Sequence, residues 1–138
     1  MLTISLEAVV QFHHRAIRRS GGLPGVRDAG ALASAVQRPQ AGFGDVEFFA
    51  TVFLKAAAIA HEIVSSHPFV DGNKRTALLA AGATLRLNGF EPDSSTEDEV
   101  RTMLALANGD RSLEQFAAWL EEHSFPLTAE PETNGSSP

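Results

Sequence analysis

The chain of 138 residues contains no cysteine, which excludes both a disulfide framework and a thiolate zinc site. No apolar stretch is long enough to cross a membrane, and the N-terminus lacks the basic and then apolar layout of a signal peptide. Positive charge is also scarce: the net charge is −6 and the pI is near 5.3, which argues against a surface that coats nucleic acid. We therefore expect a cytoplasmic protein with no membrane contact and no direct nucleic-acid contact, in which any anion site is local.

The composition suits a single globular domain. Hydrophobic residues make up 43% of the chain, which is enough for a core at this length. After Phe125 the sequence changes to proline, glutamate, threonine, glycine and serine, a composition typical of disorder. We expect one domain over residues 1–125 and a disordered C-terminal tail over residues 126–138.

Apolar residues recur at spacings of three and four along most of the chain, which predicts helices. Capping residues mark several of the expected starts, among them Ser5, Asp28, the pair Thr96 and Glu99, and the pair Ser112 and Gln115. The helices are expected at about 6–20, 29–37, 46–66, 72–87, 96–107 and 112–123. The fold class is therefore all-α, a compact bundle of about six helices.

Two of these helices are apolar over most of their length, those over residues 46–66 and 72–87. Helices of that kind belong in the centre of a domain. Because only a short loop separates them, we expect two central antiparallel helices joined by that loop.

Three histidines, His13, His14 and His61, are expected to be structural. His13 and His14 are adjacent, so on a helix they point apart and do not form a metal site. We expect His13 to be partly exposed and His61 to pack at the edge of the core.

The loop between the two central helices runs from His67 to Thr76 and reads HPFVDGNKRT. The start of a helix binds anions through its unpaired amides and its dipole, and a glycine such as Gly72 lets the backbone approach a phosphate. Arg75 can hold phosphate oxygens with its planar fork, and Asp71 can hold a magnesium ion that bridges phosphates. Histidine changes charge near neutral pH, so His67 is a candidate general base.

The alternative is a capped turn that runs into a solvated first helical turn. Against it, Lys74 and Arg75 open a helix at the end where the dipole disfavours cations, unless an anion binds there. The combination therefore favours a phosphate-handling site with a base beside it.

The full string resembles the motif of the Fic/Doc family, His-x-Phe-x-Asp/Glu-Gly/Ala-Asn-Gly/Lys-Arg, and fills every specified position from His67 to Arg75. Lys74 replaces a second glycine and Leu78 a final arginine of the AMP-transferring members, and the Doc (death-on-curing) branch shares both departures. The resemblance extends to the segment 21–25 and to the helix end at 88–90, so it covers about residues 1–125.

This resemblance implies transfer of part of a nucleotide to a protein hydroxyl, with ATP as donor and Mg²⁺ as cofactor. Phe69 would anchor the loop in the core. The implied catalytic residues are His67, Asp71, Lys74 and Arg75; the implied nucleotide-binding residues are Gly72, Asn73, Lys74 and Arg75; the implied Mg²⁺ ligand is Asp71.

Lys74 is expected to decide the reaction. In Doc-like toxins the nucleotide is reversed and exposes its γ-phosphate, so the resemblance implies a protein Ser/Thr kinase that phosphorylates elongation factor Tu and stops translation. Such a protein would be the toxin of a type II toxin-antitoxin system.

Inhibition is expected in trans, by an antitoxin protein that covers the active-site cleft. The inhibitory pattern of many Fic proteins is Ser/Thr-x-x-x-Glu-Gly/Asn, and its glutamate pairs with the final arginine. Residues 3–7 and 95–99 match only its first five positions, and Leu78 replaces that arginine.

Two other functions stay open, a Fic-type AMP transferase and a catalytically silent helical interaction module. The resemblance also suggests that the segment Pro39–Asp45 is a flap that lays the target peptide beside the active site. A plain connecting loop is an equal alternative for this segment.

Overall fold

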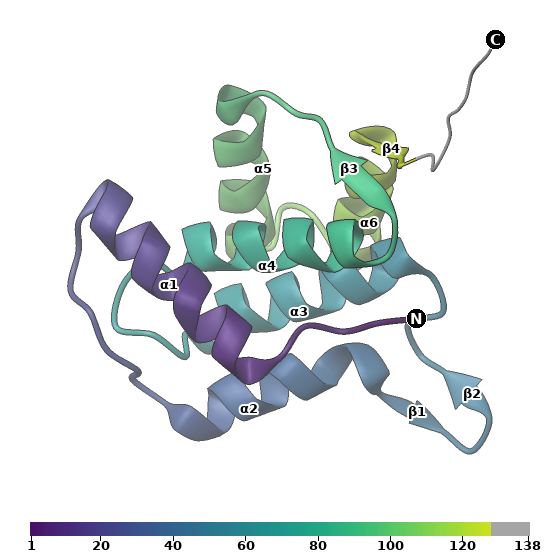
Figure 1. Ribbon diagram of the computed structural model, residues 1–138, viewed down its shortest axis with the longest axis horizontal. Helices are drawn as coiled ribbons and strands as arrows, with labels where there is room; N and C mark the ends of the chain where they lie inside the picture. Colours follow the sequence, from purple (N-terminus) through teal and green to yellow (C-terminus); the bar gives the residue numbers. More distant parts are fainter. Residues whose placement is uncertain (128–138) are drawn as a thin grey trace, which may run out of the picture.

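The computed structural model describes residues 1–127. These residues form six α-helices, which confirms the expected all-α bundle (Figure 1). The helices are α1 (Leu6–Ser20), α2 (Ala29–Gln37), α3 (Val52–Ser66), α4 (Asn73–Leu87), α5 (Thr96–Asn108) and α6 (Leu113–Glu122), with a short 3₁₀ helix η1 (Arg38–Gln40) after α2.

The two central helices are α3 and α4, which run antiparallel and are joined by the motif loop, as expected (Figure 1). Alanines along both helices are fully buried, and their small side chains let the two backbones approach closely. α2 lies along one side of this pair, α5 and α6 lie on the other, and α1 crosses α4. The motif loop is thereby anchored at one end of the most deeply buried pair of helices.

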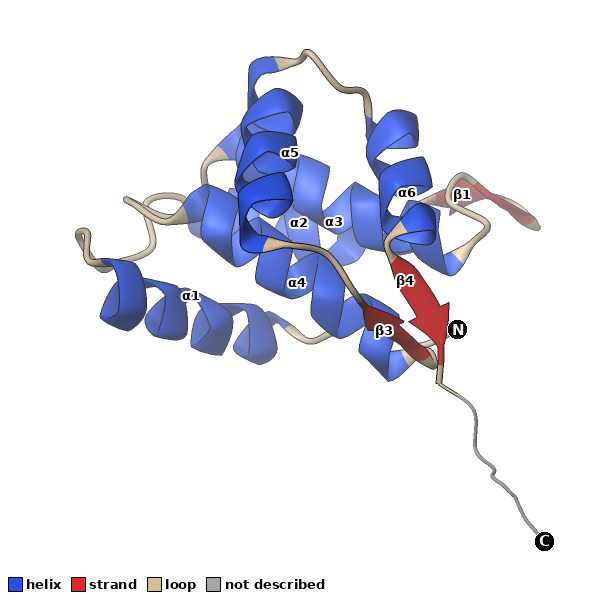
Figure 2. Cartoon of the chain, turned by 90° about the horizontal axis from the view of Figure 1, so that it is seen from above, coloured by secondary structure: helices blue, strands red, loops and turns tan. Residues whose placement is uncertain are grey.

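Four short strands were not expected from the sequence. β1 (Gly42–Phe43) and β2 (Val46–Glu47) form an antiparallel hairpin, and β3 (Phe90–Pro92) pairs with β4 (Ser124–Pro126), as Figure 2 shows for the second pair. β4 extends one residue beyond the expected domain end at Phe125. The remainder of the expected tail, residues 128–138, lies outside the described residues.

Two helix starts differ from the prediction. α3 begins at Val52 instead of Val46, because residues 46–47 pair in the hairpin and the Thr51 hydroxyl accepts a hydrogen bond from the Leu54 amide. α5 is capped by Ser95, not by Thr96 and Glu99. The expected caps of α1, α2 and α6 are confirmed, including the capping box at the start of α6.

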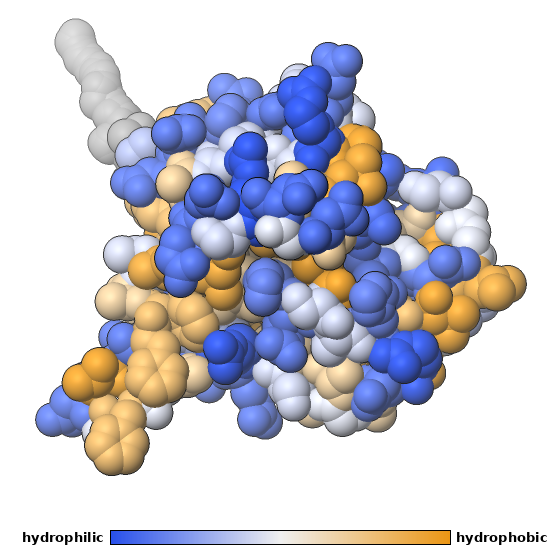
Figure 3. All heavy atoms as spheres, turned by 180° about the vertical axis from the view of Figure 1, so that it is seen from behind, coloured by the Kyte–Doolittle hydropathy of each residue, from blue (hydrophilic) through white to orange (hydrophobic). Residues whose placement is uncertain are grey.

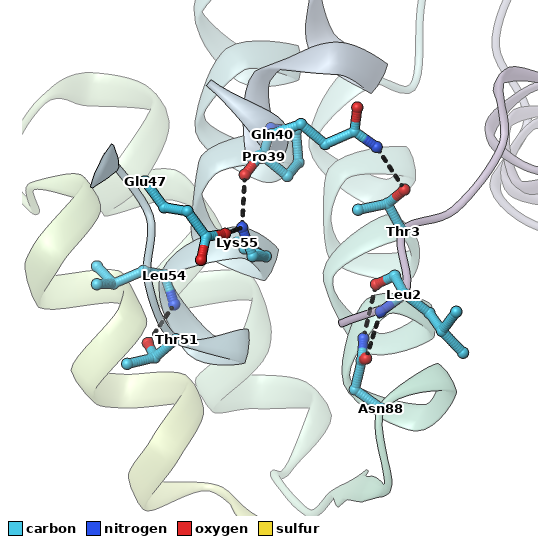
Figure 4. Close-up of polar contacts among 9 residues, drawn as sticks. All are labelled: Leu2, Thr3, Pro39, Gln40, Glu47, Thr51, Leu54, Lys55 and Asn88. Carbon is cyan, nitrogen blue, oxygen red and sulfur yellow. Dashed lines mark hydrogen bonds and ion pairs between the residues drawn. The ribbon is translucent and has the colours of Figure 1, made fainter. Parts of the chain in front are cut away.

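Lys55 holds the hairpin against the start of α3 (Figure 4). Its side chain is buried, and its Nζ donates to the Pro39 carbonyl at 3.0 Å and to Glu47 Oε1 at 2.7 Å. Lys55 therefore ties both η1 and β2 to the central helix. Nothing in the apolar pattern of α3 distinguished this lysine from a solvated one.

The hydrogen bond and the charge of Lys55 lower the pKa of Glu47 from its ordinary value of 4.5. A carboxyl group whose pKa is lower in the folded state stabilises the fold above its unfolded pKa, and this contribution disappears as the pH falls through the folded pKa. We expect the melting temperature of the native protein to exceed that of Glu47→Gln at neutral pH, and we expect this difference to shrink as the pH falls below the ordinary carboxyl pKa. Thermal unfolding of both proteins at about pH 7 and at about pH 3, which lie above and below the ordinary carboxyl pKa, measures this difference in melting temperature. A difference that persists at the acid end would contradict it.

Exposed apolar side chains gather on the hairpin, at the lower left of the space-filling view (Figure 3). They are Phe43, Val46 and Phe48. No helix formed by residues 1–127 is both long and apolar enough to cross a membrane.

Candidate active site

His67 occupies the C-cap position of α3 and is the only non-glycine residue with positive φ among residues 1–127, at φ 52°. Its amide donates to the Ile63 carbonyl, which ends the helix. A bulky residue in the left-handed region is uncommon and is held there by its surroundings. The His67 side chain is exposed, so it is available to a substrate.

Arg27 holds the His67 backbone in this conformation. Its Nε donates to the His67 carbonyl and its Nη2 to the Ser66 carbonyl, each at 2.6 Å. The guanidinium therefore pairs with two carbonyls at the C-terminal end of α3, where the helix dipole favours a cation. Sequence reasoning missed Arg27, because no local pattern connects it to a loop forty residues away.

The segment from Gly21 to Asp28 packs along the motif loop. The Pro68 carbonyl accepts hydrogen bonds from the amides of Arg27 and Asp28, the Val70 amide donates to the Gly25 carbonyl, and Val26 forms a bridge with Phe69. These contacts join the two loops into one unit beside His67.

The segment Pro39–Asp45, which was expected to be the flap, does not lie beside the motif loop. The hairpin that follows Pro39 lies at the end of α2 and α3 opposite the motif loop (Figure 1). Pro39 contacts Lys55, which precedes His67 by roughly three turns of α3. The prediction that the segment Pro39–Asp45 lies beside the active site was therefore wrong, and the alternative of a connecting segment fits. The segment that does lie there is the one from Gly21 to Asp28.

Asp71 lies at the contact between the two loops. Its Oδ2 accepts a hydrogen bond from the Leu23 amide at 3.0 Å, and the residue is exposed. Gly22 packs against it: a Cβ on Gly22 would lie 3.3 Å from Asp71 Cβ and from Oδ2, at a φ of +109° that favours glycine. The approach of the two loops therefore requires a glycine at this position.

Asp71 fits a magnesium ion that is also bound by substrate phosphates and water. No group of three or more candidate metal ligands occurs among residues 1–127, so these residues alone do not form a metal cage. Mg²⁺ is commonly held by one or two carboxylates together with substrate phosphates and water. A single exposed carboxylate beside a phosphate site has that donor set.

The first turn of α4 has the features of an anion site. Gly72 is its N-cap at φ 78°, and the first backbone hydrogen bond to the cap runs from the Thr76 amide to the Gly72 carbonyl. The amides of the three residues before Thr76 therefore precede the hydrogen-bonded part of the helix. The turn contains no acidic residue, and Lys74 and Arg75 are both exposed. Amides, dipole and two cations together form a strong local field for a phosphate.

The Asn73 side chain has a different contact from the expected one. Its Oδ1 accepts from the Phe69 amide at 3.1 Å and its Nδ2 donates to the Phe69 carbonyl at 3.0 Å. The side chain thus closes the motif loop on itself. An anion contact through Asn73 stays a prediction, and its backbone amide is the group placed to make it.

His13 was predicted to be partly exposed, and this was wrong. It is only 2% exposed, its ring stacks on Phe69 at 3.9 Å between centroids, and its Nε2 donates to the Asp71 carbonyl at 2.9 Å. Phe69 is fully buried, which confirms its expected structural role. The available signal was that His13 interrupts the apolar stripe of α1 between Val9 and Ala16.

A cavity of about 300 Å³ adjoins the first turn of α4. The start of α4 contributes polar and cationic side chains, and the later part of α4 together with α5 contributes mainly apolar ones. The lining residues are Ser20, Gly72, Asn73, Lys74, Arg75, Leu78, Glu99, Val100, Met103 and Leu104.

A model of the Fic/DOC family matches residues 3–85, more than half of the chain. The chain belongs to the Fic/Doc family. It is 39% identical over 102 residues to the toxin Doc of Mycolicibacterium smegmatis, a match that covers 72% of this chain and 78% of that protein. It is 37% identical over 97 residues to the protein kinase doc of Escherichia phage P1, with 70% and 76% covered. Both relatives carry the Doc name, which confirms the expected resemblance to that branch.

Arg27 gives a prediction for the Fic/Doc site. Arg27→Gln removes two charge-assisted hydrogen bonds, so the His67 backbone loses its support while the helical core is untouched. We expect catalytic efficiency to fall by about 10²-fold, the cost of a misplacement near 1 Å. Steady-state kinetics measure this, with Arg86→Gln at the far end of α4 as the control, because its exposed pair with Glu91 contributes little. Equal losses in both variants would show that Arg27 does not position His67.

Proposed function

We propose that the protein is the toxin of a type II toxin-antitoxin system and transfers the γ-phosphate of ATP to a serine or threonine hydroxyl of a translation factor. Elongation factor Tu is the expected target, and its phosphorylation would inhibit translation. One observation carries the proposal: His67 is an exposed histidine in the loop that leads from the end of α3 into the first turn of α4, where unpaired amides and two exposed cations suit an anion. The relative named protein kinase doc supports phosphate as the transferred group.

Each residue of the site has its own role in the proposed phosphate transfer. His67 removes the proton from the substrate hydroxyl, and the hydroxyl oxygen forms a bond to the γ-phosphorus. The bond from that phosphorus to the β,γ-bridging oxygen breaks, and ADP leaves with the electron pair while the proton stays on His67. Arg75 and the amides at the start of α4 stabilise the charge on the phosphate oxygens. A magnesium ion held by Asp71 and the phosphates would neutralise part of the same charge.

Leu78 supports transfer of phosphate rather than AMP. In AMP-transferring Fic proteins an arginine is expected at this position, one helical turn after Lys74, where it would hold another phosphate. Leu78 here belongs to the apolar wall of the cavity. The run of cations at the start of α4 therefore ends at Arg75, and position 78 offers no charge to the outer phosphates of a nucleotide in the AMP-transferring orientation.

Control by an antitoxin fits the same geometry. Neither glutamate of the two partial inhibitory patterns meets an arginine at position 78. Glu7 is exposed in the first turn of α1, and Glu99 accepts a hydrogen bond from Ser94. We propose that a segment of a separate antitoxin covers the cleft.

Labelled ATP tests the proposed reaction. The protein is incubated with elongation factor Tu, magnesium and ATP labelled at the γ- or at the α-phosphorus. We expect label on the factor only from γ-labelled ATP. Transfer from α-labelled ATP would indicate the AMP transferase, and no transfer to any protein of a translation extract would indicate the silent module.

A further inference from the structure

The residues that line the cavity beside α4 are of two chemical kinds. Lys74 and Arg75 come from the start of α4 and suit an anion. Val100 and Leu104 come from α5, are 52% and 45% exposed, and lie one helical turn apart. Exposed apolar side chains that line a concave site favour an apolar or planar ligand. A nucleotide has both chemical characters in one molecule.

Glu99 is the one carboxylate that lines this cavity among residues 1–127. Its Oε2 accepts a hydrogen bond from the Ser94 hydroxyl at 2.8 Å, and no ion pair with Glu99 is formed within the described part of the chain. Its neighbour Asp98, by contrast, is bound by Arg101 and Trp119. The Ser94 hydroxyl therefore orients the Glu99 carboxylate, and Oε1 forms no hydrogen bond within residues 1–127.

Glu99 and Leu78 both line this cavity and both also line a second, smaller one. Leu78 follows Lys74 by one turn of α4, so this part of the cavity begins where the phosphate site ends. In a nucleotide the group directly attached to the phosphates is the ribose. A carboxylate only accepts hydrogen bonds, and the two neighbouring ribose hydroxyls donate them.

We propose that the cavity beside α4 holds the nucleoside half of the nucleotide, with Glu99 accepting a hydrogen bond from the ribose hydroxyls. The base then lies against Val100 and Leu104, and Glu99 determines specificity for a ribonucleotide. This proposal rests on the proposed function, since it assumes that the phosphates bind at the start of α4.

Binding of two nucleotides tests the proposal. Calorimetry compares ATP with 2′,3′-dideoxyATP, each with magnesium, on the native protein and on Glu99→Ala. The native protein is expected to bind ATP about tenfold or more tightly than the dideoxy compound, the usual effect of a hydrogen bond to a charged group. Glu99→Ala should bind both compounds equally, at the native affinity for dideoxyATP.

Glu97→Ala is the matched control, because Glu97 is an exposed glutamate in the same turn of α5 and its loss changes the net charge equally. It should keep the native preference. Glu99→Gln keeps the size of the side chain and should lose most of the preference, and thermal unfolding verifies that each variant is folded.

Three results would overturn the proposal. Tighter binding of ATP by Glu99→Ala would mean that the carboxylate acts by repelling phosphate. A native protein that binds both nucleotides equally would mean that the ribose is not recognised, while phosphate transfer would still stand. A native protein that binds neither nucleotide would overturn the proposed function as well.

Discussion

Replacing His67 with alanine should reduce phosphate transfer by about 10²–10⁴-fold, the usual contribution of a general base. Nucleotide binding should stay nearly unchanged, because the phosphate contacts are expected from the start of α4 and not from the imidazole. The fold should persist too, since the His67 side chain is exposed and its backbone is held by Arg27. Single-turnover kinetics and ATP titration measure the two effects separately.

His14→Ala is the control for this variant, because His14 is an exposed histidine on α1 outside the motif. It should transfer phosphate at the native rate. If His67→Ala also transfers at the native rate, another group removes the proton and the assignment of the base is wrong.

The second large effect is expected when His13 is replaced, which should lower both the stability of the fold and the rate of phosphate transfer. His13→Ala removes the ring that stacks on Phe69 and the donor that satisfies the Asp71 carbonyl. A cavity next to a buried aromatic ring together with an unpaired carbonyl should lower the free energy of unfolding by about 3 kcal/mol. Urea unfolding measures the loss.

His13→Phe separates packing from hydrogen bonding. The phenyl ring can still stack on Phe69, so most of the stability should return, but the Asp71 carbonyl has no donor. We expect kcat to stay below the native value in this folded variant because the Asp71 loop is no longer fixed. Native kcat in His13→Phe would limit His13 to a packing role.

The helices and the motif could be predicted from the sequence because their signals are local. Ser5, Asp28 and Ser112 cap helices through neighbours three residues away, and the apolar stripes repeat within single elements. The hairpin was missed because Val46 continues the apolar spacing of α3. The pairing of Val46 and Glu47 with residues 42–43 and the Lys55 clamp determine the strand instead.

The support of the site could not be predicted in the same way, since it consists of contacts between distant residues. His13 meets Asp71 across 58 positions, and Leu23 meets it across 48. The motif supplied the proposed reacting groups, but only the fold shows that α1 and the segment after it hold the motif loop in place. The Asn73 side chain shows the converse: a polar residue within the motif bonds to the backbone of its own loop.

The most direct test of the proposed activity is the intact mass of elongation factor Tu after incubation with the protein, ATP and magnesium, with His67→Ala in parallel. We expect a gain of one phosphate group with the native protein and none with the variant. A gain of one AMP, or a phosphate gain that persists in His67→Ala, would contradict the proposed mechanism.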